Sequence, residues 1–538
     1  MQAIGIHSIE LVLLLLMIFV TALAALAKKW ETPYPIVLVI GGLVLSFIPH
    51  MPRIELSPDF VFLVILPPLL LGAAYETSWR DFQFNLVSIS MLAFGLVAFT
   101  VVGVALAAPW FLPHFDWRLG LVLGALVATT DAIAATSIAR RLGLPKGITD
   151  ILEGESLIND ASGLLALQFA IALVVTGKTP GWIAGAGQLL YLVFGSIAIG
   201  LVVGKLIHIF IKKIEDPAIE ITISLVAPYF AYLAAESAHA SGVMATVACG
   251  LYMGHQSSLY LSTGARLTGR AVWDTLTFIL NGMVFILIGL QLPYILRGLR
   301  TEGLSHLIVR GLVLSVVLIA LRLVWMFPGA RVANVIRRKV FHQNVVPPDA
   351  RGVFIVGWTG MRGVVALAAA ISLPEMLESG APFPHRDAMI FLTFCVILVT
   401  LVFQGLTLPP LIRRLGLAGK ESRTTEEEQA RRAMIEAALA YLEHSRDIEE
   451  DALGPMYEDL IRLQRRRLEF LNGDASEEIG PHPEYQQRYR QVLNQTRAVQ
   501  RATILHLFNQ HEIDEDVMRR LEHELDLIEA RFAVSDYA

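Results

Sequence analysis

Residues 154–160, with the sequence GESLIND, place polar and ionisable side chains inside a stretch that is otherwise apolar enough to cross a membrane. An ionised group in a membrane interior costs free energy, so such a group marks a functional site. Counted from the basic loop at 140–146 with a rise of about 1.5 Å per residue, Asp160 lies roughly 15 Å or more into a helix. That depth is near the middle of a hydrocarbon core about 30 Å thick, where transporters hold their ions. We therefore expect an ion-binding site at Asp160.

Three side chains of this segment share one face of the predicted helix. Ser156, Asn159 and Asp160 stand at positions i, i+3 and i+4. They supply hydroxyl, amide and carboxylate oxygens, a set of ligands that suits a hard cation. Glu155 points about 100° away and needs a different partner. Since residues 149–176 contain no Lys or Arg to neutralise Asp160, a purely structural role for this carboxylate is the weaker interpretation.

A second polar intrusion, residues 129–131 (Thr-Thr-Asp), lies in the middle of the apolar run 118–139. Thr and Asp are poor helix formers, and Asp is a good helix cap. We therefore expect a break here, with Asp131 capping a half-helix that begins at Ala132. A broken helix at this depth offers backbone carbonyls and helix ends to a bound ion. Asp131 as a cap alone and Asp131 as part of the ion site both remain open.

A third intrusion is the glycine-rich segment 357–363 (GWTGMRG), seven spans after the first break. Two interrupted helices at corresponding positions of two halves indicate an inverted-repeat transporter. Arg362 would then offset either backbone carbonyls or Asp131. Arg322 is the lone cation of the run 312–327, and Glu155 is its natural partner. The alternative is that Arg322 snorkels toward the membrane surface.

The composition indicates a polytopic membrane protein, because 55% of the residues are hydrophobic, only 17% are charged, and the mean hydropathy is +0.58. An apolar run of about 17–25 residues can span a bilayer. The sequence predicts thirteen spans, of which the short run at 240–254 is the weakest. The spans lie near residues 9–27, 34–49, 59–76, 84–108, 118–139, 149–176, 184–211, 217–238, 240–254, 272–293, 304–327, 351–373 and 388–411.

Basic residues predict the orientation, because Lys and Arg near span ends stay on the cytoplasmic side. They gather on alternate loops, which places the N-terminus outside and the C-terminus inside the plasma membrane. The predicted cytoplasmic loops carry Lys28, Lys29, Arg80, Arg140, Arg141, Lys146, Lys212, Lys213, Arg266, Arg270, Arg331, Arg337, Arg338, Lys339 and Arg351.

The chain changes character after residue 415, so we predict a transmembrane domain at 1–415 and a helical cytosolic tail at 416–538. Residues 420–538 hold 16 Lys and Arg against 26 Asp and Glu, a net charge of −10, while the remainder, with 27 against 22, carries +5. Apolar residues at helical spacing predict tail helices at 426–444, 456–471 and 513–532. A solvated helical bundle and a regulatory domain both remain open. Basic residues are interspersed with acidic ones, so we do not expect a nucleic-acid partner.

Five motifs together resemble the monovalent cation/proton antiporters of the sodium/proton exchanger type, in their electroneutral branch, here as a prokaryotic member with a cytosolic tail. The resemblance covers about residues 10–415. The motifs are Thr130-Asp131, residues 154–160, Ser241-Gly242 with Gly250, residues 357–363, and residues 402–408 (VFQGLTL).

The resemblance implies a homodimer of thirteen-helix protomers in the lipid membrane. Each protomer would contain a dimerisation domain and a six-helix core, whose two inverted repeats contribute the broken helices that cross near the ion. By position, Asp160 would bind the cation and accept the proton. Sodium would also be ligated by Asn159, Ser156 and the carbonyl of Thr130, and the core would be supported by Asp131, Glu155, Arg322 and Arg362.

Two positions depart from the family pattern. The family commonly has an acidic residue after the Pro-Pro-aliphatic run of the third span, but here residues 67–71 are followed by Gly72. Glu76, one turn later, is the nearest acid. The family also favours Pro after the Asp of the first break, where this chain has Ala132. Ion affinity and selectivity therefore stay open.

A buried carboxylate that holds either a proton or a cation can exchange one for the other on each side of a membrane. Because Asn159 stands where electrogenic relatives carry a second Asp, the resemblance implies electroneutral exchange of one proton per cation. We expect sodium as the cation, with potassium or lithium open, no cofactor and no enzymatic reaction.

Two other functional classes compete with an antiporter. A cation channel or uniporter could line a pore with the same oxygens. An intramembrane aspartyl protease could use Asp131 and Asp160 as two carboxylates that share a proton. This chain has no Gly-x-Gly-Asp sequence at either Asp, which the protease interpretation would require. That interpretation also leaves the buried arginines and the tail unexplained.

Overall fold

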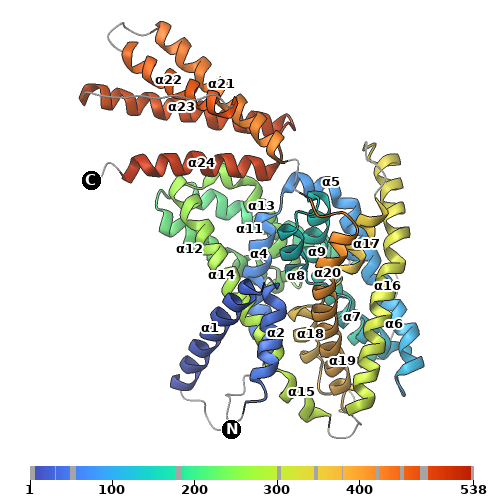
Figure 1. Ribbon diagram of the computed structural model, residues 1–538. Coiled ribbons are helices and arrows are strands. Elements are labelled where there is room, and N and C mark those ends of the chain that lie inside the picture. The colour runs from blue at the N-terminus through green and yellow to red at the C-terminus, as the bar shows by residue number, and fades with distance from the viewer. Residues whose placement is uncertain are drawn as a thin grey trace. The chain divides into compact units, whose positions relative to one another are not determined.

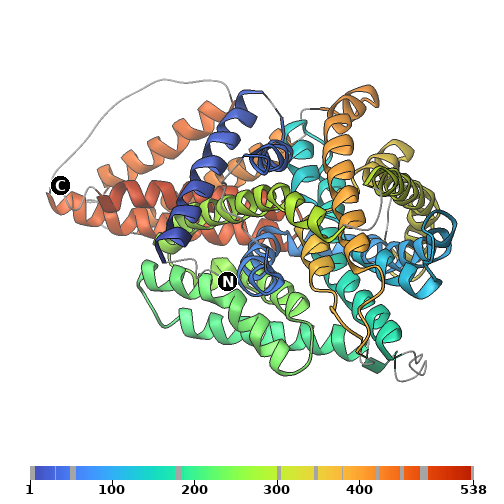
Figure 2. The ribbon, with the colours of Figure 1, turned by 90° about the horizontal axis from the view of Figure 1, so that it is seen from below.

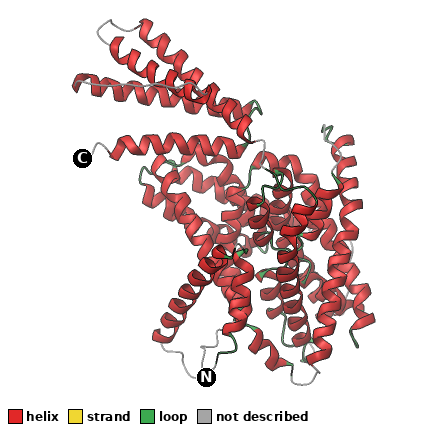
Figure 3. Ribbon diagram, viewed as in Figure 1, coloured by secondary structure: helices red, strands yellow, loops and turns green. Residues whose placement is uncertain are grey.

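The computed structural model describes residues 6–30, 32–48, 56–176, 185, 187–188, 190–299, 304–343, 349–377, 380–419, 423–448, 454–472 and 483–534. Within these ranges the chain forms helices joined by loops and contains no β-strand (Figure 3). The all-α fold class predicted from the sequence is confirmed. The chain divides into a first unit, Met1–Leu261 with Arg270–Gly419, and a second unit, Ser262–Gly269 with Lys420–Ala538.

The N-terminal part of the first unit contains the first of the two predicted breaks. Side chains cap several of its helices: Ser78 Oγ accepts a hydrogen bond from the Asp81 N–H, and Asp116 Oδ1 accepts one from the Leu119 N–H. The elements are α1 (Ile6–Lys29), α2 (Tyr34–Leu45), α3 (Pro58–Phe60), η1 (Val61–Ile65), α4 (Leu66–Glu76), α5 (Trp79–Ser90), η2 (Met91–Leu96), α6 (Val97–Phe111), α7 (Trp117–Leu126), α8 (Ile133–Arg141) and α9 (Lys146–Thr176).

The C-terminal part of the first unit contains the second predicted break. Its elements are η3 (Tyr191–Gly195), α11 (Ser196–Ile211), α12 (Pro217–Ser237), α13 (Gly242–Tyr260), α14 (Thr263–Leu290), α15 (Leu292–Gly298), α16 (Leu304–Lys339), α17 (Ala350–Trp358), α18 (Val364–Ile371), α19 (Arg386–Leu398), η4 (Val399–Gln404) and α20 (Gly405–Arg414). The first turns of α14 fall in the second unit.

Eight helical segments among the described residues are long and apolar enough to cross a membrane. Helices α2 and α7 are apolar but shorter. The weakest predicted span, 240–254, is helical from Gly242 onward, since α13 covers Gly242–Tyr260. The protein is therefore a multi-pass membrane protein, while the total of thirteen spans stays a prediction.

Two groups of helices pack around the broken ones. Helices α11, α12 and α13 pack together with α4 and stand as one group in Figure 2. Gly200 of α11 lies against the Ala245 carbonyl of α13, so a side chain there would force these two helices apart. On another side, α16 packs against α6, α17 and α19 (Figure 1). Helix α16 thereby supports the second broken helix through α17, and α9 links α13 to both halves of the first broken helix, α7 and α8.

Among its described residues, the second unit contains four long helices, α21 (Arg423–Ile448), α22 (Gly454–Asn472), α23 (Pro483–Asn509) and α24 (Glu515–Val534). The predicted tail helices correspond to α21, α22 and α24, and α23 was not predicted. Ile504 and Leu521 belong to one apolar cluster. Asp526, which is buried, accepts hydrogen bonds from Arg501 at 2.6 Å and from Nε of Arg266 at 3.1 Å. The start of α14 is therefore an ion-paired part of this unit.

Candidate ion-binding site

The first break separates α7, which ends at Leu126, from α8, which begins at Ile133. Asp131 Oδ1 accepts a hydrogen bond of 2.8 Å from the Ile133 N–H, the first N–H of α8. The predicted contact of Asp131 with the start of the half-helix is observed, but the half-helix starts one residue later than expected, and the N-cap position is Ala132. The carboxylate of Asp131 also lies against Gly363, where any side chain would overlap with it. The glycine is therefore required for the two broken helices to approach each other.

The second break separates α17, which ends at Trp358, from α18, which begins at Val364. It contacts the first break directly, because the Asp131 N–H donates a hydrogen bond of 2.8 Å to the Met361 carbonyl. Arg362 Nε donates another, of 2.9 Å, to the Val127 carbonyl at the end of α7. The two interrupted segments predicted from the sequence therefore meet at one place in the fold.

Helix α9 brings the GESLIND segment against the first break, with Thr130 at the centre of the contacts. Ser156 Oγ donates to the Thr130 carbonyl at 3.0 Å and accepts from the Ala132 N–H at 3.3 Å. Asn159 Nδ2 donates to Thr130 Oγ1, which in turn donates to Glu155 Oε1 at 3.1 Å. The structure thus brings together Ser156, Asn159 and Thr130, three of the residues predicted to bind the cation through oxygen atoms.

Asp160 is buried, with 8% of its surface exposed, yet it makes no hydrogen bond or ion pair with any described residue. The amide oxygen of Asn159 is buried as well and accepts no hydrogen bond within the described ranges. Buried polar atoms normally have partners. The oxygens of two side chains on one helix face are therefore free to bind a cation.

The oxygens around Asp160 belong to a carboxylate, an amide and a hydroxyl. In the described part of the chain, no three or more His, Cys, Asp or Glu side chains cluster in a way that could hold a metal ion. Hard oxygens in this proportion suit a weakly held monovalent cation better than a tightly bound transition metal.

Glu155 and Arg322 form the predicted pair. Arg322 Nη2 lies 2.8 Å from Glu155 Oε2, and the side chains are only 1% and 2% exposed, respectively. The snorkelling alternative for Arg322 is therefore wrong. Arg322 also donates to the carbonyls of Val356 at 3.0 Å and Gly357 at 3.2 Å, near the end of α17. One guanidinium thus joins α9, α16 and α17 beside the crossing.

Arg362 is fully buried at the crossing and serves backbone carbonyls. Besides Val127, its guanidinium donates to the Gly360 carbonyl. Its backbone N–H donates to Thr400 Oγ1 at 3.2 Å. Of the two partners predicted for Arg362, the carbonyls are observed, and the described residues show no ion pair with Asp131. A cation at the carbonyl end of α7 also stabilises that helix end.

Sequence reasoning missed the contribution of α19–η4–α20, the last helical segment of the first unit. Thr400 was not singled out, although the VFQGLTL motif lies only two residues beyond it. Thr400 accepts a hydrogen bond from the Arg362 N–H, which is available for this contact only because the helix is broken there. At Gly72, a side chain would face Trp273 and Thr277 of α14 at ordinary contact distance. A Cβ at the position of the missing acid would therefore contact α14 without a steric clash.

Comparisons with known proteins agree with this geometry. Residues 14–414 match the model of a family described as sodium/hydrogen exchanger, transmembrane. An uncharacterized Na(+)/H(+) exchanger of Mycobacterium bovis is 31% identical over 519 residues, which cover 94% of this chain and 93% of that protein. A Bacillus subtilis protein named sodium, potassium, lithium and rubidium/H(+) antiporter is 28% identical, over 93% of this chain and 74% of its own. The structure of the sodium proton antiporter MjNhaP1 from Methanocaldococcus jannaschii resembles 76% of this chain and 98% of its own, with a TM-score of 0.61 and 18% identity.

Proposed function

Because the chain belongs to the sodium/hydrogen exchanger family and is a monovalent cation/proton antiporter, we propose that it exchanges sodium for protons, one for one, at Asp160. The observation that carries the assignment is the buried Asp160 carboxylate without a partner among the described residues, next to an Asn159 oxygen that accepts no hydrogen bond there. The family consists of transporters, so the protease alternative is set aside.

The exchange needs a group that holds a proton or a cation but not both. Burial favours the neutral form of a carboxylate, and a bound cation favours the charged form. The proton on Asp160 would therefore leave when sodium binds, with Asn159, Ser156 and the Thr130 carbonyl as further oxygen ligands. Asp131, Glu155, Arg322 and Arg362 would keep the two breaks in register while the core moves between the two sides of the membrane.

The preferred cation is proposed as sodium, and potassium and lithium are the first competitors to test. The Bacillus subtilis relative is named for exchange of four alkali cations. In this chain Gly72 removes one expected carboxylate, and Trp273 and Thr277 lie beside the position. A site with a single carboxylate and neutral oxygens discriminates between cations mainly by size, so we expect modest selectivity.

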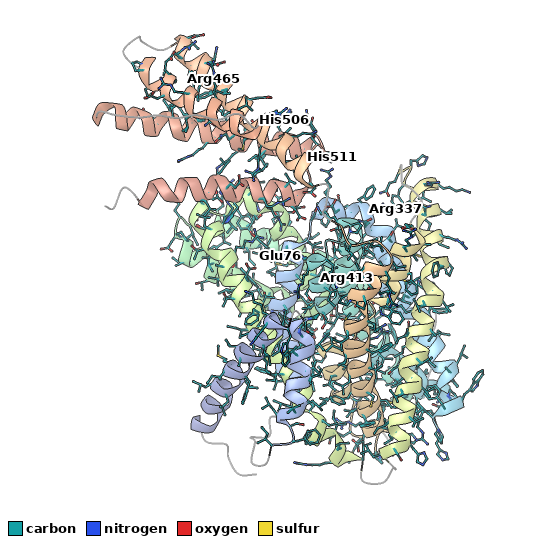
Figure 4. The ribbon with its side chains drawn as sticks, in the orientation of Figure 1. Glu76, Arg337, Arg413, Arg465, His506 and His511 are labelled. Carbon is teal, nitrogen blue, oxygen red and sulfur yellow. The ribbon has the colours of Figure 1, made fainter. Side chains whose placement is uncertain are left out.

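We further propose the topology and assembly that the sequence predicted. The N-terminus would lie outside the plasma membrane and the C-terminus inside, with two protomers forming a homodimer in lipid. Glu76, Arg337 and Arg413 lie toward the same end of the first unit (Figure 4), which agrees with the predicted cytoplasmic side of all three. The tail would be a cytosolic helical module, for which a solvated bundle and a regulatory domain are the two alternatives.

Everted membrane vesicles test the proposed function. In vesicles that hold an acid-inside pH gradient, added sodium should collapse the gradient in proportion to the amount of the protein, and potassium and lithium should act at higher concentrations. Titration of each cation across a range of pH values measures the preference. A channel or uniporter would instead move sodium without proton counterflow, and vesicles without the protein provide the baseline.

We expect exchange to be insensitive to membrane potential. With one carboxylate per site, one proton leaves for each cation that enters, so no net charge crosses. A potential imposed with a potassium ionophore should change the sodium/proton exchange rate by less than about twofold. If one net charge crossed the membrane in each cycle, a potential of 100 mV would instead change the free energy of transport by about 2.3 kcal/mol.

Glu76 is the acid that would make exchange electrogenic if it moved a second proton. Glu76 lies four residues before Arg80, a spacing that would bring the two side chains together on one continuous helix. The two residues lie on different helices, because α4 ends at Glu76 and α5 begins at Trp79. Glu76 is exposed at the end of α4. A voltage-dependent rate that disappears in Glu76→Gln would contradict the expectation.

A further inference from the structure

The segment α19–η4–α20 runs alongside the second break and holds it at two points. Thr400 Oγ1 accepts a hydrogen bond of 3.2 Å from the Arg362 N–H. Thr407 Oγ1 accepts one of 3.0 Å from Trp358 Nε1. These contacts bind the two sides of the unwound segment 359–361. This segment of helix is therefore a direct neighbour of the crossing and not only a peripheral span.

Gln404 lies between these two contacts in the sequence. It is the last residue of the π-helical turn η4, a type of turn that is often found at functional sites. Its side chain is fully buried, as is that of Thr400 one turn earlier. Neither the oxygen nor the nitrogen of the Gln404 amide has a hydrogen-bond partner within the described ranges. The VFQGLTL motif thus places an unpaired amide beside the second break.

An unpaired amide in a buried, membrane-embedded position is unfavourable, because no protein group within the described ranges compensates its lost hydrogen bonds. A Met or Leu of similar size would be more stable in this conformation. Gln291 provides the contrast. It is also fully buried, but its Oε1 accepts from the Leu56 N–H at 3.3 Å and its Nε2 donates to the Leu287 carbonyl at 3.4 Å.

We propose that Gln404 is a positioning residue for alternating access. In the conformation that opens to the other side of the membrane, its amide hydrogen-bonds the unwound backbone at 359–361, and in the conformation described here it is unpaired. The inference rests on the proposed exchange by movement of the broken helices. Because the amide gains partners in one state only, it lowers the energy of that state relative to this one and keeps both populated.

Gln404→Met tests the inference, with Gln291→Met as the matched control. Each variant replaces a fully buried glutamine with an apolar side chain of similar length. We expect Gln404→Met to melt in detergent at the wild-type temperature or above it. Its maximal sodium/proton exchange rate in vesicles should fall at least about tenfold, and the sodium concentration for half-maximal rate should stay within about twofold, because the ligands of the cation are untouched. Gln291→Met should melt at a lower temperature, since it strands the Leu56 N–H.

Two results would overturn the inference. If Gln404→Met melts at a lower temperature to the same extent as Gln291→Met, the amide has a partner in this conformation and its role is structural. If Gln404→Met is stable and exchanges at the wild-type rate, the amide plays no part in the cycle. Loss of exchange in Asp160→Asn beside normal exchange in Gln404→Met would retain the proposed function and reject this inference alone.

Discussion

Asp160→Asn should abolish cation-dependent proton movement and leave the fold intact. The amide has nearly the shape of the carboxylate, but it can neither release a proton nor carry the charge that attracts the cation. Asp160 makes no hydrogen bond or ion pair with the described residues that the substitution would break. We expect exchange in everted vesicles to fall to the level of vesicles without the protein, with an unchanged melting temperature in detergent.

Asp274→Asn is the matched control for this prediction. Asp274 lies in α14, another candidate span, but its side chain is exposed. The same chemical change at Asp274 should leave the rate of sodium/proton exchange close to that of the wild type. Exchange by Asp160→Asn at near wild-type rates, for any of the three cations, would show that another group carries the proton.

The main parts of the site could be predicted from the sequence because they are polar groups in an apolar background. A carboxylate in a span demands an explanation wherever the chain folds, and residues at i, i+3 and i+4 share a face in any helix. The same logic found the partner of Arg322, since Glu155 was the nearest acid that pointed away from the cation face. The breaks at 129–131 and 357–363 followed from helix propensity and glycine content.

Contacts that depend on how helices pack could not be predicted. The hydrogen bond between the Asp131 N–H and the Met361 carbonyl joins two backbones, so no side chain announces it. Arg362 had two plausible partners, and only the fold decides between them. The start of a new helix at Trp79 could not be predicted either, because Thr77 and Ser78 look ordinary, but Ser78 Oγ caps that helix by accepting a hydrogen bond from the Asp81 N–H.

The second unit shows the limit of periodicity. Helix α23 was missed because its first half, residues 483–498, is dominated by Gln, Arg and Asn, and its apolar residues are too sparse to show a regular stripe. The buried face of α23 includes long polar side chains, such as Gln500 and Arg497, which are almost fully buried. Such a helix owes its place to tertiary contacts more than to its own pattern.

Removal of either partner of the Glu155–Arg322 pair should reduce stability strongly. Both side chains are almost completely buried, so a single substitution leaves an uncompensated charge in the core, at a cost of about 3–5 kcal/mol. Glu155→Gln and Arg322→Met should therefore both lower the melting temperature of the purified protein in detergent. Glu153→Gln, on the same helix, is the matched control: its partner Arg140 is 60% exposed, and such surface pairs contribute about 0–1 kcal/mol.

A double variant in which the charges at positions 155 and 322 are swapped should recover only part of the lost stability. A carboxylate at position 322 would face the carbonyls of Val356 and Gly357, which accept hydrogen bonds from the arginine in the native protein. Repulsion between these oxygens limits the recovery, whereas a simple two-body ion pair would be restored completely. Single variants that melt at the wild-type temperature would show that the pair does not hold the core, and full recovery in the double variant would show that the carbonyl contacts of Arg322 contribute nothing to the stability of the second break.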